Sequence, residues 1–240
     1  MSATRWGRKG RAGTPPSQLL YRVVRDALVA FARVYLRLQV VGREHVPTSG
    51  PFVVAPVHRS NLDFFLAASI QRKRQRYMGK DSLWKVHPAF SWFLSSLGGY
   101  PVARGAADRE ALRTTVSLVQ AGEPVVLFPE GQRQSGPEVQ PLFDGAAYVA
   151  SRCQVPILPV GIGGSERAMP KGARFIRPRR VAVVIGPPLP PAPMKEGGTV
   201  SRRGVKELTE QLHKELQRLF DDAQRLAGQP ADQPVDQPEK

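Results

Sequence analysis

The strongest constraint on the fold is a regular alternation of short apolar runs with helical patterns. The apolar runs are rich in β-branched and aromatic residues, are often bounded by Gly or Pro, and cover residues 52–57, 75–78, 125–128, 155–160 and 181–185. The helical patterns between and after them cover residues 61–72, 81–97, 107–121, 143–153 and 203–226. Strands that alternate with helices build mainly parallel sheets. The sequence therefore predicts a single α/β domain with a mostly parallel central sheet flanked by helices.

The ends of the chain differ in composition from this central part. We expect residues 1–17 to form a disordered basic arm and residues 227–240 a disordered tail that repeats Asp-Gln-Pro. Residues 18–41 are expected to hold an N-terminal amphipathic helix, with arginines along one side and apolar residues along the other. The α/β domain then spans residues 42–226. From the pattern alone, the helix either packs on its own domain or lies at a membrane interface.

The charge of the chain restricts its partners. The 240 residues include 35 Lys and Arg against 20 Asp and Glu, which gives a formal net charge of +15. Such a charge implies an anionic partner, namely nucleic acid, an acidic membrane surface or a phosphorylated substrate. One group of basic residues combines two parts of the chain: Arg72, Lys73, Arg74, Arg76, Arg174, Arg177, Arg179 and Arg180. We expect it either to bind anionic headgroups or to be a solvated basic surface.

Cysteine use and hydropathy exclude several classes of protein. A single cysteine, Cys153, rules out an internal disulfide framework and a Cys-based zinc site, and its helical context predicts a core thiol. No group of His, Asp and Glu has convincing metal spacing, so no metal is expected. The longest run without charged residues, 86–103, is broken by Pro and Gly and does not read as a membrane span. We expect a peripheral or monotopic protein on the cytoplasmic side of the cell membrane.

Residues 58–63 are the first group that could carry chemistry, where an apolar run ends and a helix should begin. Residues five apart on a continuous helix diverge by about 140°, given ~3.6 residues per turn, so His58 and Asp63 can meet only if the chain bends. The imidazole is then a candidate general base, and Asp63 holds its tautomer. The alternative is that Asp63 only stabilises the helix N-terminus and His58 is an ordinary loop residue.

Three further blocks stand near apolar runs. In residues 128–133, Glu130 could orient a hydroxyl and Arg133 could hold a phosphate through its planar guanidinium. A glycine-rich turn and a strand-like piece lead to Arg104, and residues 155–161 combine apolar residues with two prolines. The alternatives are a turn with a solvated ion pair, a surface Arg and a buried edge strand, respectively.

In order and spacing, these four blocks resemble the four motifs of the glycerolipid acyltransferases, the 1-acyl-sn-glycerol-3-phosphate acyltransferase family. The first motif of that family is a His, four residues and an Asp, and it matches residues 58–63. The second motif ends in an Arg and matches residues 99–104.

The third motif of the family, Phe-Pro-Glu-Gly-Thr-Arg-Ser, matches residues 128–134, with Gln132 and Gln134 in place of Thr and Ser. The fourth motif is a Val-Pro-Ile-x-Pro-Val run and matches residues 155–160. The resemblance covers roughly residues 38–186.

The resemblance implies a glycerolipid acyltransferase-like fold and an acyl transfer without metal, cofactor or covalent intermediate. By this interpretation His58, oriented by Asp63, deprotonates the free hydroxyl of a lysophospholipid, which attacks the thioester of acyl-CoA or an acyl-carrier protein. The implied acceptor is 1-acylglycerol 3-phosphate, and the product is phosphatidic acid. Acceptor or phosphate binding is implied for Glu130, Gly131, Arg133, Arg104 and Lys80. Contact with the acyl donor is implied for Val155, Pro156 and Pro159.

Other functions stay open at this point. The acceptor could be another lysophospholipid or glycerol 3-phosphate. A nucleic-acid-binding protein would explain the charge, but no RNA-recognition signature, zinc finger or helix-turn-helix pattern supports it, so no nucleic acid is expected. A lipid-binding protein without catalysis is the third possibility, against which the intact His58, Asp63 and Glu130 argue.

Overall fold

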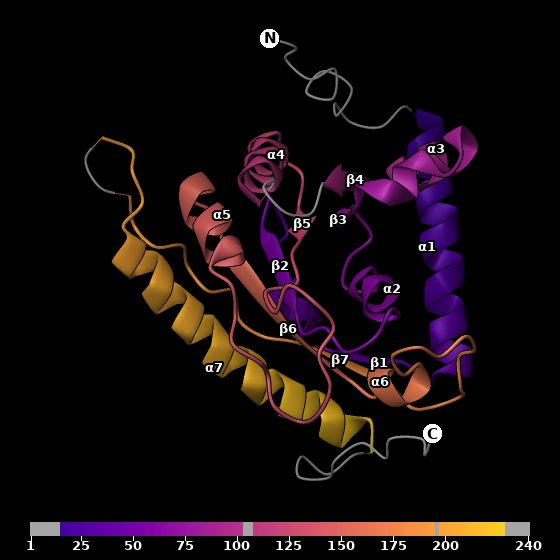
Figure 1. The fold of residues 1–240 in the computed structure, drawn as a ribbon. Coiled ribbons are helices and arrows are strands. Elements are labelled where there is room, and N and C mark those ends of the chain that lie inside the picture. Colours follow the sequence, from indigo (N-terminus) through magenta and orange to yellow (C-terminus); the bar gives the residue numbers. More distant parts are fainter. Residues whose placement is uncertain (1–14, 103–107, 195–196, 229–240) are drawn as a thin grey trace.

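A seven-stranded sheet with helices on both sides forms the centre of the computed structural model, which describes residues 15–102, 108–194 and 197–228 (Figure 1). The strands are β1 (Gln39–Val41), β2 (Val53–Pro56), β3 (Arg76–Lys80), β4 (Gly99–Val102), β5 (Val125–Val126), β6 (Ile157–Gly163) and β7 (Ala182–Ile185). Their order across the sheet is β1-β7-β6-β2-β5-β3-β4. Every neighbouring pair is parallel except β6 and β7. The predicted fold class, a mostly parallel α/β sheet, is confirmed.

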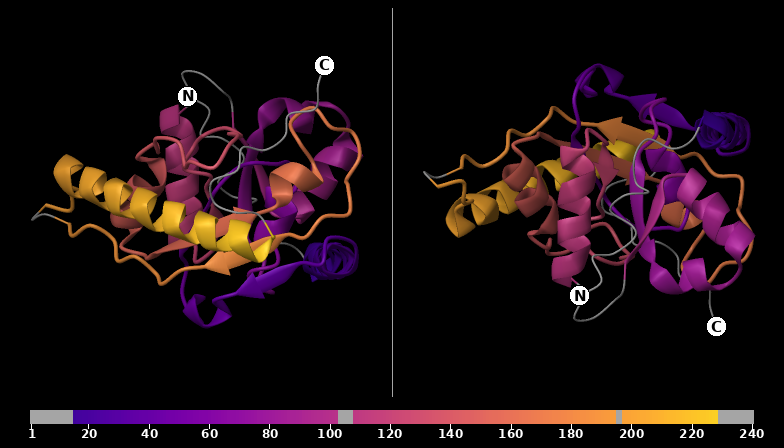
Figure 2. Two further views of the ribbon diagram at one scale, coloured as in Figure 1. Left: turned by 90° about the horizontal axis from the view of Figure 1, so that it is seen from below. Right: turned by 90° about the horizontal axis from the view of Figure 1, so that it is seen from above.

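The helices lie on both sides of this sheet. They are α1 (Pro15–Tyr35), η1 (Arg43–His45), α2 (Asp63–Ala67), η2 (Asp81–Lys85), α3 (Pro88–Ser96), α4 (Asp108–Gln120), α5 (Gly145–Cys153), α6 (Ser165–Ala168) and α7 (Arg202–Leu226). Figure 1 shows α4, α5 and α7 to the left of the sheet and α1, α2 and α3 to the right. Helix α1 is seen end-on at the edge of the molecule in both views of Figure 2.

The central strands form the core because helices cover both of their faces. All residues of β2, β6 and β7 are buried, and their runs of Val, Ile and Leu are typical of a parallel sheet. Helix α7 approaches β6 very closely at two glycines. An added Cβ would lie 2.1 Å from the Leu219 carbonyl oxygen at Gly161 and 2.3 Å from backbone atoms of Ala223 at Gly163. Glycine is therefore required at both positions.

The edge-strand alternative for the proline-containing run is wrong. β6 pairs with β2 on one side and with β7 on the other. Pro159 lacks an N–H, but it lies between the Ile157–Leu189 bridge and the β7 ladder, and its carbonyl accepts from the Gly186 N–H at 3.0 Å. A proline is tolerated here because the pairing with β7 does not require an N–H donor at this position.

The N-terminal helix differs from its predicted bounds. It begins at Pro15, inside the expected arm, and ends at Tyr35, whereas residues 39–41 form β1 and not helix. Arg37 adopts a left-handed conformation at φ 47°, and Gln39 then donates its N–H to Val181. Strand pairing with β7 thus replaces the helical pattern. The remainder of the expected arm, 1–14, and most of the expected tail, 229–240, lie outside the described residues.

Helix α1 packs on its own domain and also leaves apolar residues exposed. One stripe packs on the domain: Tyr21, Arg25, Val29, Ala32 and Leu36 are buried. A second apolar stripe is exposed: Leu19, Val23, Phe31, Val34 and Tyr35. No helix in the described parts of the chain combines the length and the apolar character needed to cross a membrane.

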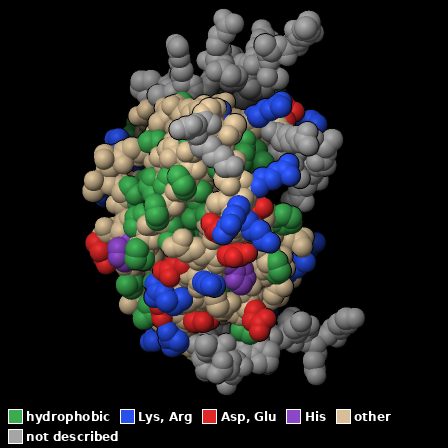
Figure 3. Space-filling model, turned by 90° about the vertical axis from the view of Figure 1, so that its left-hand side faces the viewer, with side chains coloured by type: hydrophobic (Ala, Val, Ile, Leu, Met, Phe, Trp, Pro, Cys, Tyr) green, Lys and Arg blue, Asp and Glu red, His purple; other side chains and the backbone are tan. Residues whose placement is uncertain are grey.

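Side chains of both charges are mixed on one side of the molecule (Figure 3). On the side of the molecule that carries α4, α5 and α7, Figure 3 shows Lys and Arg side chains beside Asp and Glu side chains. Exposed ion pairs along α7 account for part of this balance, such as Arg203–Glu207 at 2.8 Å. Exposed pairs of this kind contribute little stability.

Candidate active site

His58 and Asp63 meet just beyond the carboxyl end of β2. The His58 Nδ1 atom lies 3.0 Å from the Asp63 Oδ2 atom, and the two side chains are 9% and 0% exposed. The chain turns through residues 59–62 before α2 begins at Asp63, so the two residues do not share a continuous helix. The structure therefore contains the bend that the sequence analysis requires. Their roles as base and orienting acid stay predictions.

The Asp63 carboxylate is held by the chain that turns around it. Its Oδ2 atom accepts hydrogen bonds from the backbone N–H groups of Arg59 at 2.6 Å and Ser60 at 2.7 Å. Charge-assisted bonds of this length fix the orientation of the carboxylate. The Ser60 hydroxyl in turn donates to the Met169 carbonyl at 2.8 Å, which ties the turn to the segment after α6.

The His58 ring is held by aromatic contacts. It stacks on Phe128 with ring centroids 4.1 Å apart and meets Phe64 edge-on at 5.3 Å. Phe128 comes from the segment after β5 and Phe64 from α2, so packing between two elements fixes the ring plane. Because Nδ1 faces Asp63, Nε2 is the ring nitrogen available to exchange a proton with a substrate.

Arg59 and Glu130 form a buried ion pair directly beside this histidine. The Arg59 Nη1 atom lies 2.5 Å and 2.8 Å from the two carboxylate oxygens of Glu130, and the side chains are 1% and 0% exposed. Arg59 also donates to the carbonyls of His58 at 3.2 Å and Glu138 at 2.8 Å, and its guanidinium lies 4.7 Å from the Phe220 ring centre. The pair therefore joins the β2 turn, the loop after β5 and α7.

Burial dominates the electrostatics of Glu130. It raises the pKa of the carboxyl group above its ordinary value, while the Arg59 charge and the hydrogen bond from Arg59 oppose that shift. The His58 backbone N–H points at the same carboxylate over 3.4 Å. The acceptor contact implied for Glu130 stays a prediction, because the contacts that the structure shows are to Arg59 and to the backbones of His58 and Gln140.

Gly131 needs to be glycine. It has φ 71°, and an added Cβ would lie 2.7 Å from the ring of Phe143. Its N–H donates to the Phe128 carbonyl at 3.0 Å, while the Gln134 N–H donates to the His58 carbonyl at 2.8 Å. The loop after β5 is thereby pinned to the His58 turn by its backbone.

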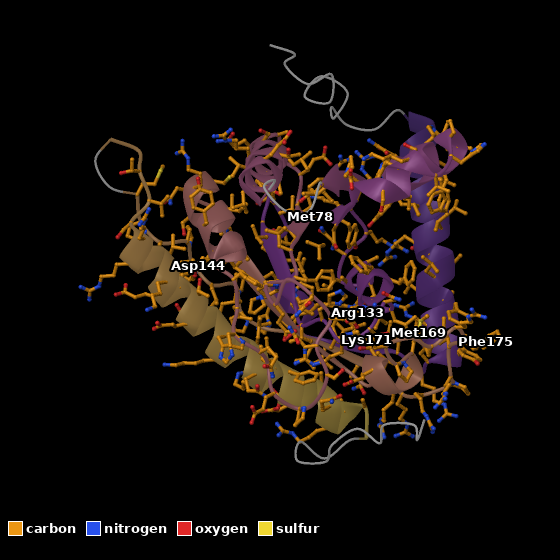
Figure 4. All side chains as sticks on the ribbon, viewed as in Figure 1. Met78, Arg133, Asp144, Met169, Lys171 and Phe175 are labelled. Carbon is orange, nitrogen blue, oxygen red and sulfur yellow. The ribbon has the colours of Figure 1, made fainter. Side chains whose placement is uncertain are left out.

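The structure gives the positions of two of the other three predicted phosphate contacts, Arg133 and Lys80. Arg133 is half-buried in the loop after β5, where Figure 4 labels it, and none of the described carboxylates forms an ion pair with it. Lys80 ends β3, whose carboxyl end lies at the same edge of the sheet as that of β2. Arg104 lies outside the described residues.

The implied donor-site residues belong to the sheet interior. Val155 and Pro159 are buried, and the Pro156 carbonyl accepts from the Val53 N–H at 3.0 Å. Val53 pairs with Ile157 at the amino ends of the parallel strands β2 and β6. The structure therefore does not bring Val155 and Pro156 to the His58 edge of the sheet, and their contact with an acyl donor stays a prediction.

Comparison with known proteins decides the family. A family model described as acyltransferase matches residues 37–163, which is more than half of the 240-residue chain. The chain belongs to the acyltransferase family. The match spans β2 with the His58–Asp63 turn, the loop with Glu130 and Arg133, and all of β6.

Two named relatives of this acyltransferase come from a bacterium and a plant. It is 26% identical over 201 residues to the 1-acyl-sn-glycerol-3-phosphate acyltransferase of Bacillus subtilis, covering 83% of this chain and 96% of the relative. It is 28% identical over 145 residues to the chloroplastic 1-acyl-sn-glycerol-3-phosphate acyltransferase BAT2 of Brassica napus, and the match covers 59% of this chain but only 42% of that longer protein.

A solved structure supports the same relationship. The crystal structure of the 1-acyl-sn-glycerophosphate (LPA) acyltransferase PlsC from Thermotoga maritima superposes with a TM-score of 0.67 and 25% sequence identity, covering 84% of this chain and 80% of that chain. The resemblance drawn from the four motifs is thereby confirmed.

Sequence reasoning missed three side chains of the acyltransferase site. Arg59 stands next to His58, and its burial could have been suspected only from the apolar run that precedes it. Phe128 ends an apolar run, so its contact with His58 is not visible in the pattern. Glu166 is buried in α6, where burial raises its pKa while hydrogen bonds from Ser135 and Gly136 oppose the shift, and the charges of Arg59 and Asp63 also act on its carboxyl group.

Cys153 has the surroundings of a structural thiol. Cys153 is half-buried, its Sγ lies 3.8 Å from the Val116 carbonyl oxygen, and burial raises the pKa of the thiol. A raised pKa disfavours the thiolate that nucleophilic catalysis requires. In residues 15–102, 108–194 and 197–228, no three His, Cys, Asp or Glu side chains group as metal ligands do.

Proposed function

We propose that this acyltransferase moves a fatty acyl group from acyl-CoA or an acyl-carrier protein to the free hydroxyl of 1-acylglycerol 3-phosphate, giving phosphatidic acid. The observation that carries the proposal is the 3.0 Å contact between His58 and the fully buried Asp63 at an edge of the sheet. The names of the relatives from Bacillus subtilis and Thermotoga maritima support the choice of acceptor.

In this reaction His58 acts first as a base and then as an acid. His58 Nε2 takes the proton of the acceptor hydroxyl as the oxygen attacks the thioester carbonyl carbon. When the tetrahedral intermediate collapses, the C–S bond breaks and the imidazolium returns the proton to the leaving thiolate. Asp63 stabilises the imidazolium in between. General base catalysis of this kind contributes about 10²–10⁴-fold to the rate.

The acceptor phosphate requires cationic groups near this base. Arg133 meets the requirement because it lies in the loop whose backbone is pinned to His58 and forms no ion pair with the described carboxylates. Its planar fork suits a phosphate monoester. We assign the same role to Lys80 and Arg104 on the basis of the family resemblance.

The test is a panel of substrates with the purified full-length chain. Labelled long-chain acyl groups on CoA and on acyl-carrier protein are offered with lysophosphatidic acid, other lysophospholipids and glycerol 3-phosphate, and the His58→Ala variant measures background. We expect transfer to lysophosphatidic acid to exceed transfer to any other acceptor. A clear preference for another acceptor would reject the substrate, and no transfer from either donor would reject the activity.

We also propose that the chain binds the cytoplasmic face of an anionic membrane through α1. Leu19, Val23 and Val34 are exposed. At about 100° per residue, their positions in the sequence place them on one side of that helix. Buried apolar area together with attraction to anionic lipids determines the strength of interfacial binding. The triple variant L19S/V23S/V34S should sediment less with anionic vesicles than the wild type.

The control for this experiment is the variant M194S/L226S, which removes two exposed apolar side chains from other parts of the molecule. It should sediment like the wild type. Equal sedimentation of all three proteins would reject α1 as the membrane contact, and unchanged thermal melting would show that the fold is intact.

A further inference from the structure

A polar cavity lies at the opposite edge of the sheet from His58. Its volume is about 910 Å³, and it is formed by α1, the segment before β3 and the turn before β5. Its lining includes Tyr21, Arg22, Arg25, Arg72, Lys73 and Arg74. Residues 72–74 and 121–124 lead into the amino ends of β3 and β5, whereas His58 follows the carboxyl end of β2. A strand of five residues, the length of β3, separates the two edges by roughly 16 Å at ~3.3 Å per residue.

The lining carries more positive than negative charge. Five Arg and Lys side chains face two carboxylates, those of Asp26 and Glu123. Asp26 is paired with Arg25, and Glu123 lies 3.6 Å from Arg74.

Three exposed cations of this lining are left without such a partner. Among the residues that the structure describes, none of Arg22, Arg72 and Lys73 has a carboxylate within ion-pair distance. Concave surfaces lined by one sign of charge concentrate counter-ions.

Neighbouring groups respond to this positive charge. The hydrogen bond from Arg25 lowers the pKa of Asp26, and the charges of Arg72 and Arg22 add to the effect. Burial lowers the pKa of the nearby Arg76, and repulsion from Arg74 contributes. The Asp26 shift shows that these cations stabilise a neighbouring negative charge, whereas the Arg76 shift is mainly an effect of burial.

Buried contacts hold the lining in place. The Arg25 Nε atom donates to the Ala68 carbonyl at 3.1 Å, and the Tyr21 hydroxyl donates to the Lys73 carbonyl at 3.4 Å. Arg25 and Tyr21 are 7% and 3% exposed. Helix α1 is thus fixed against the 68–73 segment, and a ligand does not have to order the backbone of either element when it binds.

We propose that this cavity binds a phosphate-bearing anion through Arg22, Arg72 and Lys73. Guanidinium forks and a lysine ammonium are the usual cationic partners of phosphate oxygens. Two sources share this chemistry, the headgroup of an anionic phospholipid and a soluble phosphorylated compound. The exposed apolar residues Leu19 and Val23 stand beside Arg22 on α1 and favour the headgroup. The site is separate from the proposed transfer reaction, so its test measures binding and not turnover.

The experiment is calorimetric titration of the full-length chain with two probes. One is dihexanoyl phosphatidylglycerol below its micelle concentration, with dihexanoyl phosphatidylcholine as the zwitterionic reference, and the other is inorganic pyrophosphate. The variant R22Q/R72Q/K73Q should bind the anionic probes about ten-fold or more weakly than the wild type, because each lost phosphate contact is a charge-assisted hydrogen bond. Preference for the lipid probe identifies a headgroup site, and preference for pyrophosphate a site for a soluble anion.

The matched control removes three exposed cations from α7: Arg202, Lys206 and Lys214, each changed to Gln. This variant should bind the probes within about two-fold of the wild type, because screening weakens charges beyond ~10 Å. The variant R133Q, which removes the proposed acceptor-phosphate contact near His58, should keep the binding that R22Q/R72Q/K73Q loses. Equal weakening by the two triple variants, loss of binding in R133Q, or no binding by the wild type would each overturn the proposal. Thermal melting checks that all variants are folded.

Discussion

The buried pair of Arg59 and Glu130 allows a quantitative prediction about stability. Arg59→Met removes the bonds to Glu130 at 2.5 Å and 2.8 Å and leaves that carboxylate 0% exposed without its cation. Removal of one partner of a buried ion pair costs about 3–5 kcal/mol. The same range includes the free energy lost with the Arg59 bonds to the carbonyls of His58 and Glu138. We therefore expect the free energy of unfolding of R59M to fall by about 4 kcal/mol.

Urea unfolding followed by circular dichroism measures this change. With an m-value of about 2–3 kcal/mol/M, the midpoint of unfolding should fall by roughly 1–2 M. The double variant R59M/E130Q leaves no buried charge in the pair, so it should be more stable than R59M alone. A cost below about 1 kcal/mol for R59M, or a double variant whose loss equals the sum of the two single losses, would refute this reasoning.

The pH dependence of R59M provides a second check on the same pair. Burial already raises the pKa of Glu130, and removal of the Arg59 charge takes away an opposing influence. A carboxyl group whose pKa is higher in the folded than in the unfolded state favours folding at low pH, and this contribution is lost as the pH rises through the folded pKa. The deficit of R59M relative to the wild type should therefore be smaller at pH 5 than at pH 8.

Three further substitutions test other contacts. Asp63→Asn should lower kcat by about 10²–10⁴-fold with little effect on KM, because the imidazolium of His58 loses its anion; steady-state kinetics would contradict this with a rate near that of the wild type. Gly131→Ala should destabilise the chain by about 1–3 kcal/mol in urea unfolding, because it forces φ 71° on a residue with a Cβ and pushes the Phe143 ring; an unchanged midpoint would show that the loop adapts freely. Gly161→Ala should cost about 3 kcal/mol or more, because its Cβ would overlap the backbone of α7, and wild-type stability would contradict the close approach.

Much of the fold follows from local pattern. The runs that contain β2, β6 and β7 are apolar because both faces of those strands are covered, and such runs are visible without any structure. β1 was not predictable in the same way. Its three residues follow a helix directly, and only pairing with β7 defines it as a strand.

In the candidate site, too, contacts between neighbouring residues could be anticipated and contacts between distant residues could not. The spacing of His58 and Asp63 at a strand end allowed their contact if the chain bends between them, and this condition could be stated because the turn and the pair are local. The pairing of Arg59 with Glu130 joins residues 71 positions apart and depends on which side chain turns inward, which no local pattern specifies. The cavity beside α1 needs three separate segments and was predictable only as a cluster of basic residues.

The most direct test of the central claim is the acyl-transfer rate of His58→Ala under saturating lysophosphatidic acid and acyl donor. If His58 is the general base, the rate should fall by at least about 10²-fold while circular dichroism and thermal melting stay close to those of the wild type. A folded His58→Ala protein that turns over at the wild-type rate would show that the His58–Asp63 pair does not carry the reaction.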